Sequence, residues 1–411
     1  MQQKIERLDT WIYYALCGLA LSLFSTVAGS SIFLGLAIAL FALRIALRRD
    51  DLWEPFKMYR RFVYAYGLFV LAMLVSALFS GDIRQGVGLV VSRQGYYVMP
   101  CVIVMAIVRD KDKLVFLAKL VLLSLLANNI FLLWKAWKLQ YLRVAGLVGY
   151  MALAAVYSVV IPVLFLGAAH FKGGWRWICF VSGLSCIAAN LFTGTRSGWL
   201  TSAMVLFIIA VLYTKNKGNI VVGVIVAVAC MAVVFIASPQ LRARFTSMGE
   251  PEKLMSVTER FSMWRSAVNV WKDYPVFGIG IGQYTKAYQT KYCLPESKDY
   301  KRPPEQRLKH PHSNFMLILS EAGIVGAATF MLFLGLLLWF SLHGWWKTKD
   351  ALYLVLLSIL LGTQLQGVMD TNITMTVVSK AYWFFIGSVL QMLAVNCDEE
   401  PLALVRGKGE L

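Results

Sequence analysis

Two histidines stand directly before a long apolar run, in the segment His310-Pro311-His312-Ser313-Asn314. The N-terminus of a helix carries a partial positive charge, which favours a neutral imidazole at His312 and leaves that ring able to accept a proton. We predict that His312 is a general base and that His310 supports it. An ordinary interfacial histidine is one alternative. An H-x-H metal site is another, but no third histidine and no carboxylate cluster stands near in sequence, so we predict no metal.

A tight turn carries an arginine between two apolar runs, in the segment Thr193-Gly194-Thr195-Arg196-Ser197. This position places Arg196 at a boundary between membrane and water. Arginine binds phosphate through two parallel hydrogen bonds, and the flanking small residues expose backbone donors. We predict that Arg196 binds a phosphate or pyrophosphate group. The alternative is an arginine that extends to the interface and anchors a helix end.

Two further arginines, Arg260 and Arg265, lie in a segment with helical spacing. Ser256 and Glu259 form a capping box, apolar residues recur every three or four positions, and Pro275 ends the run. This pattern predicts an amphipathic helix on the outer membrane face. Both arginines are candidate ligands of the same anion, although they project about 140° apart around a helix and do not serve one site equally. The alternative is a basic helix that contacts lipid headgroups alone.

Two acidic residues are predicted to support the site. Glu321 lies roughly two and a half turns into the helix that follows His312, and an acid within a span usually faces a partner or a cavity. We expect Glu321 to orient an arginine or a polar backbone group. Asp370 stands in a short outer turn, where it either caps a helix or completes the site.

The run Gly278-Ile279-Gly280-Ile281-Gly282 is not a nucleotide-binding loop. A dinucleotide loop needs G-x-G-x-x-G spacing between a strand and a helix, and this run has neither that spacing nor that context. We interpret it as a tight turn that redirects the chain.

The composition limits the class of protein that positions these residues. The chain has 411 residues, of which 59% are hydrophobic and 15% are charged, with a formal net charge of +18. Soluble chains carry about a quarter charged residues. A cytosolic enzyme, a nucleic-acid-binding protein and a disordered chain are therefore excluded, and no C-x-x-C pair suggests a zinc or redox motif. The sequence predicts a polytopic membrane protein without cofactors.

Hydropathy predicts about twelve transmembrane helices, and backbone exposed to lipid must be helical in spans of this length. We therefore predict an all-α fold with transmembrane helices one to nine in 1–237, a large periplasmic loop with amphipathic helices and the active-site residues in 238–313, and helices ten to twelve with a tail in 314–411. The apolar runs lie near 11–27, 29–47, 62–80, 95–108, 114–133, 146–168, 176–193, 198–213, 219–237, 314–341, 351–368 and 374–395.

Lysine and arginine set the orientation. They are concentrated in alternate short connections, which predicts that both termini are cytoplasmic and that the loop 238–313 lies outside. A second basic surplus remains on the outer side, around Arg196, Arg260 and the segment leading to His312. Long translocated loops tolerate charge, but a basic outer surface also attracts anionic ligands, and phosphate or pyrophosphate lipids are the candidates in that compartment.

With these residues in place, the sequence resembles the O-antigen ligase and polymerase superfamily, most closely the O-antigen ligases. His312 and Ser313, then nine residues, then Gly323 and Gly326, fit the family pattern H-[NSQ]-x9-G-x-x-[GTY]. The turn that ends in Arg196, the segment that begins at Arg260, and the order of spans around one large loop also match.

The resemblance implies a metal-independent glycosyltransferase of lipopolysaccharide biosynthesis in the bacterial inner membrane. Such an enzyme joins O-antigen polysaccharide, carried on undecaprenyl pyrophosphate, to lipid A–core oligosaccharide on the periplasmic side. By resemblance, Arg196 and Arg260, with Arg265 as a further candidate, hold the donor pyrophosphate. His312 then deprotonates the acceptor hydroxyl.

Three alternatives remain open. O-antigen polymerases and protein O-oligosaccharyltransferases use the same donor and differ in the acceptor. A transporter of lipid-linked glycans belongs to another class and would need polar or broken helices around a midplane cavity. The candidate residues cluster at one face instead, which favours an enzyme.

Overall fold

The protein is a bundle of helices. The structure, a computed structural model, describes residues 2–48, 52–139, 143–214, 251–307 and 310–406, and these residues contain no β-strand. The α-helices are α1 (Gln2–Ser22), α2 (Val27–Leu47), α3 (Glu54–Met58), α4 (Arg60–Leu78), α5 (Ile83–Val90), α6 (Tyr97–Ile107), α7 (Lys111–Leu139), α8 (Tyr150–His170), α9 (Gly173–Phe192), α10 (Arg196–Tyr213), α13 (Pro251–Asp273), α14 (Tyr284–Ala287), α15 (Asn314–Thr348), α16 (Ala351–Met369) and α17 (Thr376–Arg406).

Ten described segments are long and apolar enough to cross a membrane, which confirms an all-α polytopic membrane protein. They are α2, α4, the segment from α5 to α6, α7 to α10, and α15 to α17. The first of the twelve predicted runs forms α1, which is not among these ten because charged residues fill its first turns. The ninth, 219–237, lies outside the described residues.

The fourth predicted span, 95–108, has the wrong start. The structure has an apolar segment from Ile83 to Ile107, in which α5 continues through a π-helix, η1 (Val91–Tyr96), into α6. Hydropathy alone missed the first half because Arg93 and Gln94 lower the average there, although Gln94 is buried inside the bundle.

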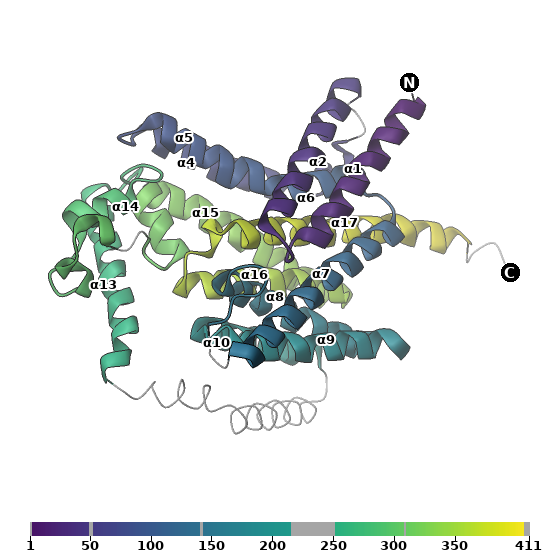
Figure 1. Ribbon diagram of the computed structural model, residues 1–411. Coiled ribbons are helices and arrows are strands. Elements are labelled where there is room, and N and C mark those ends of the chain that lie inside the picture. The colour runs from purple at the N-terminus through teal and green to yellow at the C-terminus, as the bar shows by residue number, and fades with distance from the viewer. Residues whose placement is uncertain (1, 49–51, 140–142, 215–250, 308–309, 407–411) are drawn as a thin grey trace.

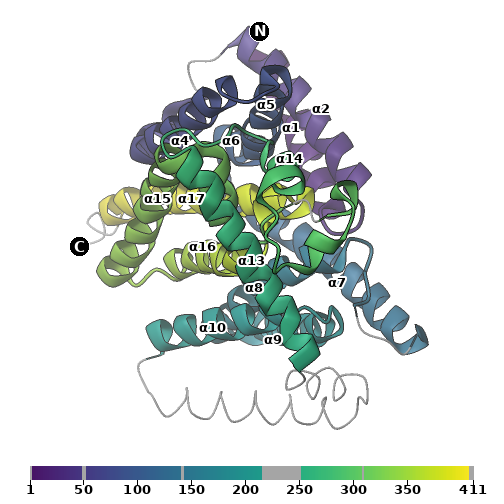
Figure 2. The same ribbon diagram turned by 90° about the vertical axis from the view of Figure 1, so that its left-hand side faces the viewer.

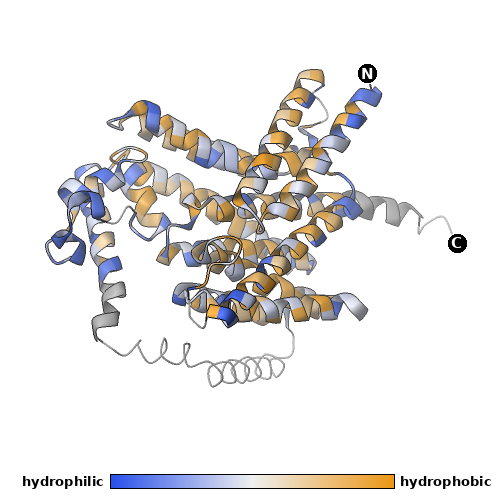
Figure 3. Cartoon of the chain, in the orientation of Figure 1, coloured by the Kyte–Doolittle hydropathy of each residue, from blue (hydrophilic) through white to orange (hydrophobic). Residues whose placement is uncertain are grey.

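The two ends of the bundle differ in polarity. The start of α1 and the far end of α17 lie at one end, and α13 and α14 lie at the opposite end (Figure 1). Turned by 90°, α13 crosses in front of the bundle helices (Figure 2). Apolar residues follow the bundle helices, whereas hydrophilic residues gather around α14 (Figure 3). The predicted site residues on α13 and at the start of α15 therefore share the polar end.

Helix α15 is interrupted at Gly323. Its backbone there has φ 63° and ψ −162°, outside the helical region, so the two halves of α15 meet at a kink. A Cβ at this position would overlap the carbonyl oxygen of Val276. Only glycine combines this left-handed backbone with such a close approach. This is a physical reason for the first glycine, Gly323, in the pattern H-[NSQ]-x9-G-x-x-[GTY].

The glycine-rich loop fills the kink. The amides of Ile279 and Gly280 donate to the carbonyls of Ser320 and Glu321, at 3.0 Å each. On the other side of the kink, the amide of Ile324 donates to Pro275 O at 2.9 Å. The loop therefore supplies the partners that a broken helix loses. The predicted tight turn is confirmed, and it also fixes the end of α13 against α15.

Replacing Gly323 with alanine should destabilise the protein. Alanine pays about 1–2 kcal/mol for the left-handed backbone, and its methyl group collides with a backbone atom that cannot move aside. We expect a lower midpoint of thermal unfolding in detergent. Gly335→Ala, in the same helix and with nothing within 4 Å of an added Cβ, is the matched control and should be neutral or stabilising. Equal midpoints for the two variants would contradict this account of the kink.

Candidate active site

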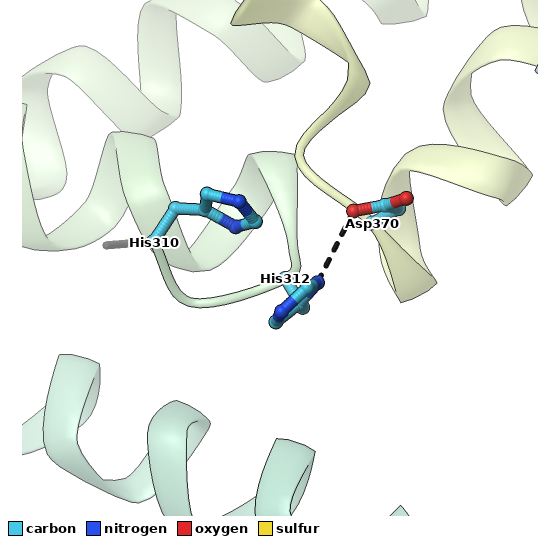
Figure 4. A group of neighbouring side chains, drawn as sticks. All are labelled: His310, His312 and Asp370. Atoms are coloured by element: carbon cyan, nitrogen blue, oxygen red, sulfur yellow. Dashed lines mark hydrogen bonds and ion pairs between the residues drawn. The ribbon is translucent and has the colours of Figure 1, made fainter. Parts of the chain in front are cut away.

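His312 and Asp370 form a pair at the polar end of the bundle. His312 precedes Ser313, the N-cap of α15, and Asp370 is the C-cap of α16. The Nδ1 atom of His312 lies 3.2 Å from Oδ1 of Asp370, and the two side chains are 17% and 4% exposed. Figure 4 shows both histidines on the segment before α15 and Asp370 on the turn after α16. Asp370 thus stands at the end of α16 and reaches the histidine.

Buried amides hold the two segments of this pair together. The Nδ2 group of Asn314 donates to Oδ1 of Asn372 at 2.7 Å, and the amide of Ile373 donates to Oδ1 of Asn314 at 3.2 Å. Asn372 in turn donates to Oε1 of Gln366 at 2.6 Å. Sequence reasoning assigned no role to these amides. The sequence does show an asparagine, Asn314, directly after His312 and Ser313. Its partner Asn372 lies 58 residues further along the chain, so the sequence alone did not indicate the contact.

The backbone of His312 is strained. Its φ is 49°, in the left-handed region that non-glycine residues rarely occupy. Such strain persists where the surroundings fix the conformation, and it is concentrated at functional sites. Here the Asp370 contact and the start of α15 fix it. In this conformation the Nδ1 side of the imidazole faces Asp370.

His310 contacts the same ring. The centroids of His310 and His312 are 4.4 Å apart in an edge-to-face arrangement. Burial lowers the pKa of His310 and His312 lowers it further, while Asp370 acts in the opposite direction. Burial also acts to raise the pKa of Asp370, but the hydrogen bond and charge of His312 and the Thr371 amide outweigh it, so this pKa lies below its usual range. Asp370 is therefore an anion at neutral pH.

Helix α13 brings Arg260 to this pair. Burial lowers the pKa of Arg260, and the nearby charge of Asp370 raises it, so the guanidinium stands within electrostatic reach of that carboxylate. Arg265 lies elsewhere. Its NH1 group pairs with Oε1 of Glu296 at 2.7 Å, and its side chain is 70% exposed. The angular separation expected from helical geometry thus divides the two arginines between the site and the outer surface.

The start of α13 differs from the prediction. The helix begins at Pro251, so the capping box at Ser256 and Glu259 is wrong as its N-terminus. Glu259 caps another segment instead: its carboxylate accepts from Ser297 Oγ and from the amide of Lys298, at 2.8 Å each. The Glu259 carboxylate does accept hydrogen bonds at the start of a helical segment, as in a capping box. That segment belongs to a distant loop and not to α13. The predicted end before Pro275 is confirmed at Asp273.

Arg196 is the first residue of α10, on a turn held by its neighbours. Gly194 has φ 62°, and Thr193 Oγ1 donates to Asn190 O at 2.6 Å. The indole of Trp199 donates to the same carbonyl at 2.8 Å. Arg196 itself is partly buried. The predicted turn is therefore held by these hydrogen bonds and places this arginine at the N-terminus of a helix.

Glu321 lies beneath the glycine-rich loop. The amides of Gly282 and Tyr284 donate to its carboxylate, the latter at 3.3 Å, and Arg93 lies 3.9 Å from it. Ser76 Oγ donates to its backbone carbonyl at 2.6 Å. Glu321 thus holds backbone and faces an arginine, next to the kink in α15.

The donor groups of His310, His312 and Asp370 all lie within 4.8 Å of one another and could hold a metal ion. The sequence argument against a metal assumed that no carboxylate stands beside these histidines, and that premise is wrong, because Asp370 reaches them from a distant turn. The charge nevertheless disfavours a divalent cation. Arg260 already places a permanent positive charge near Asp370, and two like charges at one carboxylate repel.

Acid should destabilise the fold through His310. Its pKa is lower in the folded state than the value of about 6.5 in an unfolded chain, so the unfolded state binds more protons as pH falls through that value. Asp370 acts in the same direction near pH 4. We expect a lower unfolding midpoint at about pH 5.5 than at about pH 8, with a smaller difference in His310→Gln. His170→Gln, at an exposed position, should keep the wild-type difference, and an unchanged difference in His310→Gln would refute the assignment.

Comparison with known proteins gives one family. Residues 181–331 match the family model described as O-antigen ligase, a range that contains Arg196, Arg260 and His312. An uncharacterized protein of Haemophilus influenzae is 26% identical over 142 residues, which cover 32% of this chain and 35% of the relative. The chain thus matches about a third of the length of that curated relative. The predicted resemblance to the O-antigen ligase and polymerase superfamily is confirmed over residues 181–331, where the chain is similar to the O-antigen ligases.

Proposed function

We propose that this protein is an O-antigen ligase, a membrane glycosyltransferase of lipopolysaccharide biosynthesis. Its donor is O-antigen polysaccharide on undecaprenyl pyrophosphate, and its acceptor is lipid A–core oligosaccharide on the periplasmic side of the inner membrane. The observation that carries the proposal is the His312–Asp370 pair beside Arg260, in a chain whose residues 181–331 match the O-antigen ligase family.

His312 is the proposed general base. Because Nδ1 faces Asp370, Nε2 takes the proton of the acceptor hydroxyl. The hydroxyl oxygen forms the new bond to the anomeric carbon of the donor sugar. The bond from that carbon to the phosphate oxygen breaks, and undecaprenyl pyrophosphate leaves with the electron pair. Asp370 orients the imidazole and stabilises the imidazolium that forms, as a buried carboxylate does in a catalytic triad.

Arg260 and Arg196 are the proposed pyrophosphate ligands. Negative charge accumulates on the phosphate oxygen as the glycosidic bond breaks, and fixed cations placed there lower the barrier. Arg260 comes from α13 and Arg196 from the N-terminus of α10, where backbone amides add to the positive field. These fixed cations supply the charge that a metal ion would otherwise contribute, so the reaction is proposed to be metal-independent. Arg265, on the outer surface with Glu296, is left out of this clamp.

A reconstituted assay tests the proposal. Purified protein in nanodiscs is incubated with lipid-linked O-antigen, lipid A–core and EDTA, and the product is followed by gel electrophoresis and mass spectrometry. We expect polysaccharide joined to lipid A–core in the presence of chelator. A second arm omits lipid A–core, and lengthening of the donor glycan there would assign the protein as a polymerase. Product that depends on added Mg²⁺ or Zn²⁺ would overturn the metal-independent mechanism and point to His310, His312 and Asp370 as ligands.

A further inference from the structure

The His312–Asp370 pair lies between two flanks of the bundle. In both views, α10 lies on one side of α15 and α16, and α5 lies on the other (Figures 1 and 2). Arg196 belongs to the α10 flank. A transferase whose two substrates are both anchored in the membrane must bring two lipids to one base. The flank of α5 and η1 is therefore where a site for the second lipid would be expected.

Two adjoining cavities open on that flank. The larger contains about 520 Å³ of empty space and the smaller about 290 Å³, open solvent included, and they share Arg93, Gln94 and Ile373. The smaller is also lined by Leu317 and Thr374. These two residues belong to the segments that begin with His312 and Asp370, since Leu317 is in the first turns of α15 and Thr374 follows the α16 turn. The smaller cavity is thus lined in part by the two segments that follow His312 and Asp370.

Arg93 stands where the two cavities meet. It lies on the π-helix η1, and such wide turns are frequent at functional sites because they redirect side chains. Its side chain is 25% exposed, and its NH1 group lies 3.9 Å from the carboxylate of Glu321. That distance is too long for a hydrogen bond. The Glu321 carboxylate already accepts from the loop amides, so the five guanidinium donors of Arg93 retain capacity for an anionic ligand.

Aromatic side chains form about half of the lining of the larger cavity. Tyr66 and Phe69 contribute from α4, Phe330 and Phe333 from α15, and Trp383 from α17. Tyr66 OH donates to the carbonyl of Gln94 at 2.8 Å, which fixes one wall to the π-helix. A cation at the edge of an aromatic chamber suits a molecule with an anionic group next to hydrocarbon. Arginine binds phosphate through two parallel hydrogen bonds.

We propose that Arg93 and the aromatic cavity form the acceptor-side lipid site, which binds a phosphate carried by the acceptor lipid and the hydrocarbon next to it. The donor pyrophosphate occupies the other flank, at Arg196 and Arg260, and His312 lies between the two lipids. The assignment of this lipid as the acceptor rests on the proposed function. The binding of a lipid phosphate at Arg93 does not depend on it.

Binding measurements test the site directly. The probes are fluorescent lipid A–core, the same molecule after phosphatase treatment, and inorganic phosphate, with the full-length protein in nanodiscs. Loss of a charge-assisted contact weakens binding by about tenfold or more, so Arg93→Gln should bind phosphorylated lipid A–core at least that much more weakly, and Arg93→Lys less so. Arg84→Gln, an exposed arginine on the preceding helix, should bind within about twofold of wild type. Equal binding by Arg93→Gln and wild type would overturn the site.

Two further arms identify the ligand. The phosphatase-treated lipid should bind wild type as weakly as phosphorylated lipid binds Arg93→Gln. Inorganic phosphate at millimolar concentration should not displace the lipid, and displacement would overturn the lipid assignment in favour of a free anion. Val378→Phe narrows the larger cavity without changing Arg93 or Glu321, and it should weaken lipid binding even if Arg93→Gln is poorly folded. Unchanged binding by Val378→Phe would count against the aromatic chamber.

Kinetics separate this proposal from the proposed function. Arg93→Gln should raise KM for the acceptor about tenfold and leave KM for the donor within about twofold. A similar rise in both constants would overturn the assignment to one flank. If wild type transfers no glycan but binds lipid phosphate through Arg93, the function fails and the site stands. If transfer occurs and neither Arg93→Gln nor Val378→Phe changes acceptor binding, the function stands and the site fails.

Discussion

His312→Ala is expected to lower the rate of glycan transfer by about 10²- to 10⁴-fold, the range measured for loss of a positioned general base. The variant removes the nitrogen that is proposed to take the proton of the acceptor hydroxyl and leaves Asp370 and His310 in place. Alanine shares with histidine the cost of the left-handed backbone at φ 49°, so the variant reports on the imidazole and not on the strain. Single-turnover transfer in nanodiscs, with donor and acceptor both saturating, measures the effect.

Asp370→Asn should have a smaller effect in the same direction. Asparagine keeps the shape of this buried side chain but offers an amide where His312 Nδ1 now meets a carboxylate, and it removes the charge that stabilises the imidazolium. His170→Gln, at an exposed position on the end of α8, is the control and should keep the wild-type rate. If His312→Ala retains more than about a tenth of the wild-type rate at correct fold, a positioned base is not at this residue.

Much of the architecture follows from patterns that one segment contains by itself. Hydropathy located nine of the ten described spans because a lipid-facing helix needs a long apolar run whatever its neighbours are. It failed at the segment from α5 to α6, where Gln94 is buried among protein and not against lipid. A sequence average cannot distinguish a polar residue in water from one inside the bundle. The same reason hid the kink at Gly323, because a glycine in an apolar run does not show which loop will fill the break.

For the candidate site as well, local patterns could be predicted from the sequence and long-range contacts could not. Helical geometry alone separated Arg260 from Arg265, because five residues rotate a side chain by about 140°. The contact between His312 and Asp370 joins residues 58 positions apart, and no local pattern reports such a pair. The capping box at Glu259 shows the opposite error, in which a correct local pattern serves a distant segment. The residue types thus suggested the chemistry of the site. The contacts of each residue could be identified only from the three-dimensional structure.

Arg260→Gln is expected to lower kcat/KM for the donor by about 10²- to 10³-fold, the loss that follows removal of one fixed charge from a developing anion. Glutamine keeps much of the length of the side chain and some hydrogen-bonding capacity but no charge. Arg260 is partly buried on α13 and interacts with Asp370, so its charge acts in a region where water screens it poorly. Arg260→Lys should recover only part of the activity, because lysine restores the charge but not the two parallel hydrogen bonds.

Arg265→Gln is the matched control, because it makes the same substitution one and a half turns later on the same helix. Its side chain is 70% exposed and pairs with Glu296 on the surface, and exposed ion pairs contribute about 1 kcal/mol or less. We expect donor kinetics within about twofold of wild type, together with an unchanged unfolding midpoint. If α13 bound the donor as a general basic surface, Arg260→Gln and Arg265→Gln would lose similar amounts of kcat/KM for the donor. Equal losses would therefore refute a specific pyrophosphate contact at Arg260, whereas a loss confined to Arg260→Gln requires that the charge be placed beside the His312–Asp370 pair.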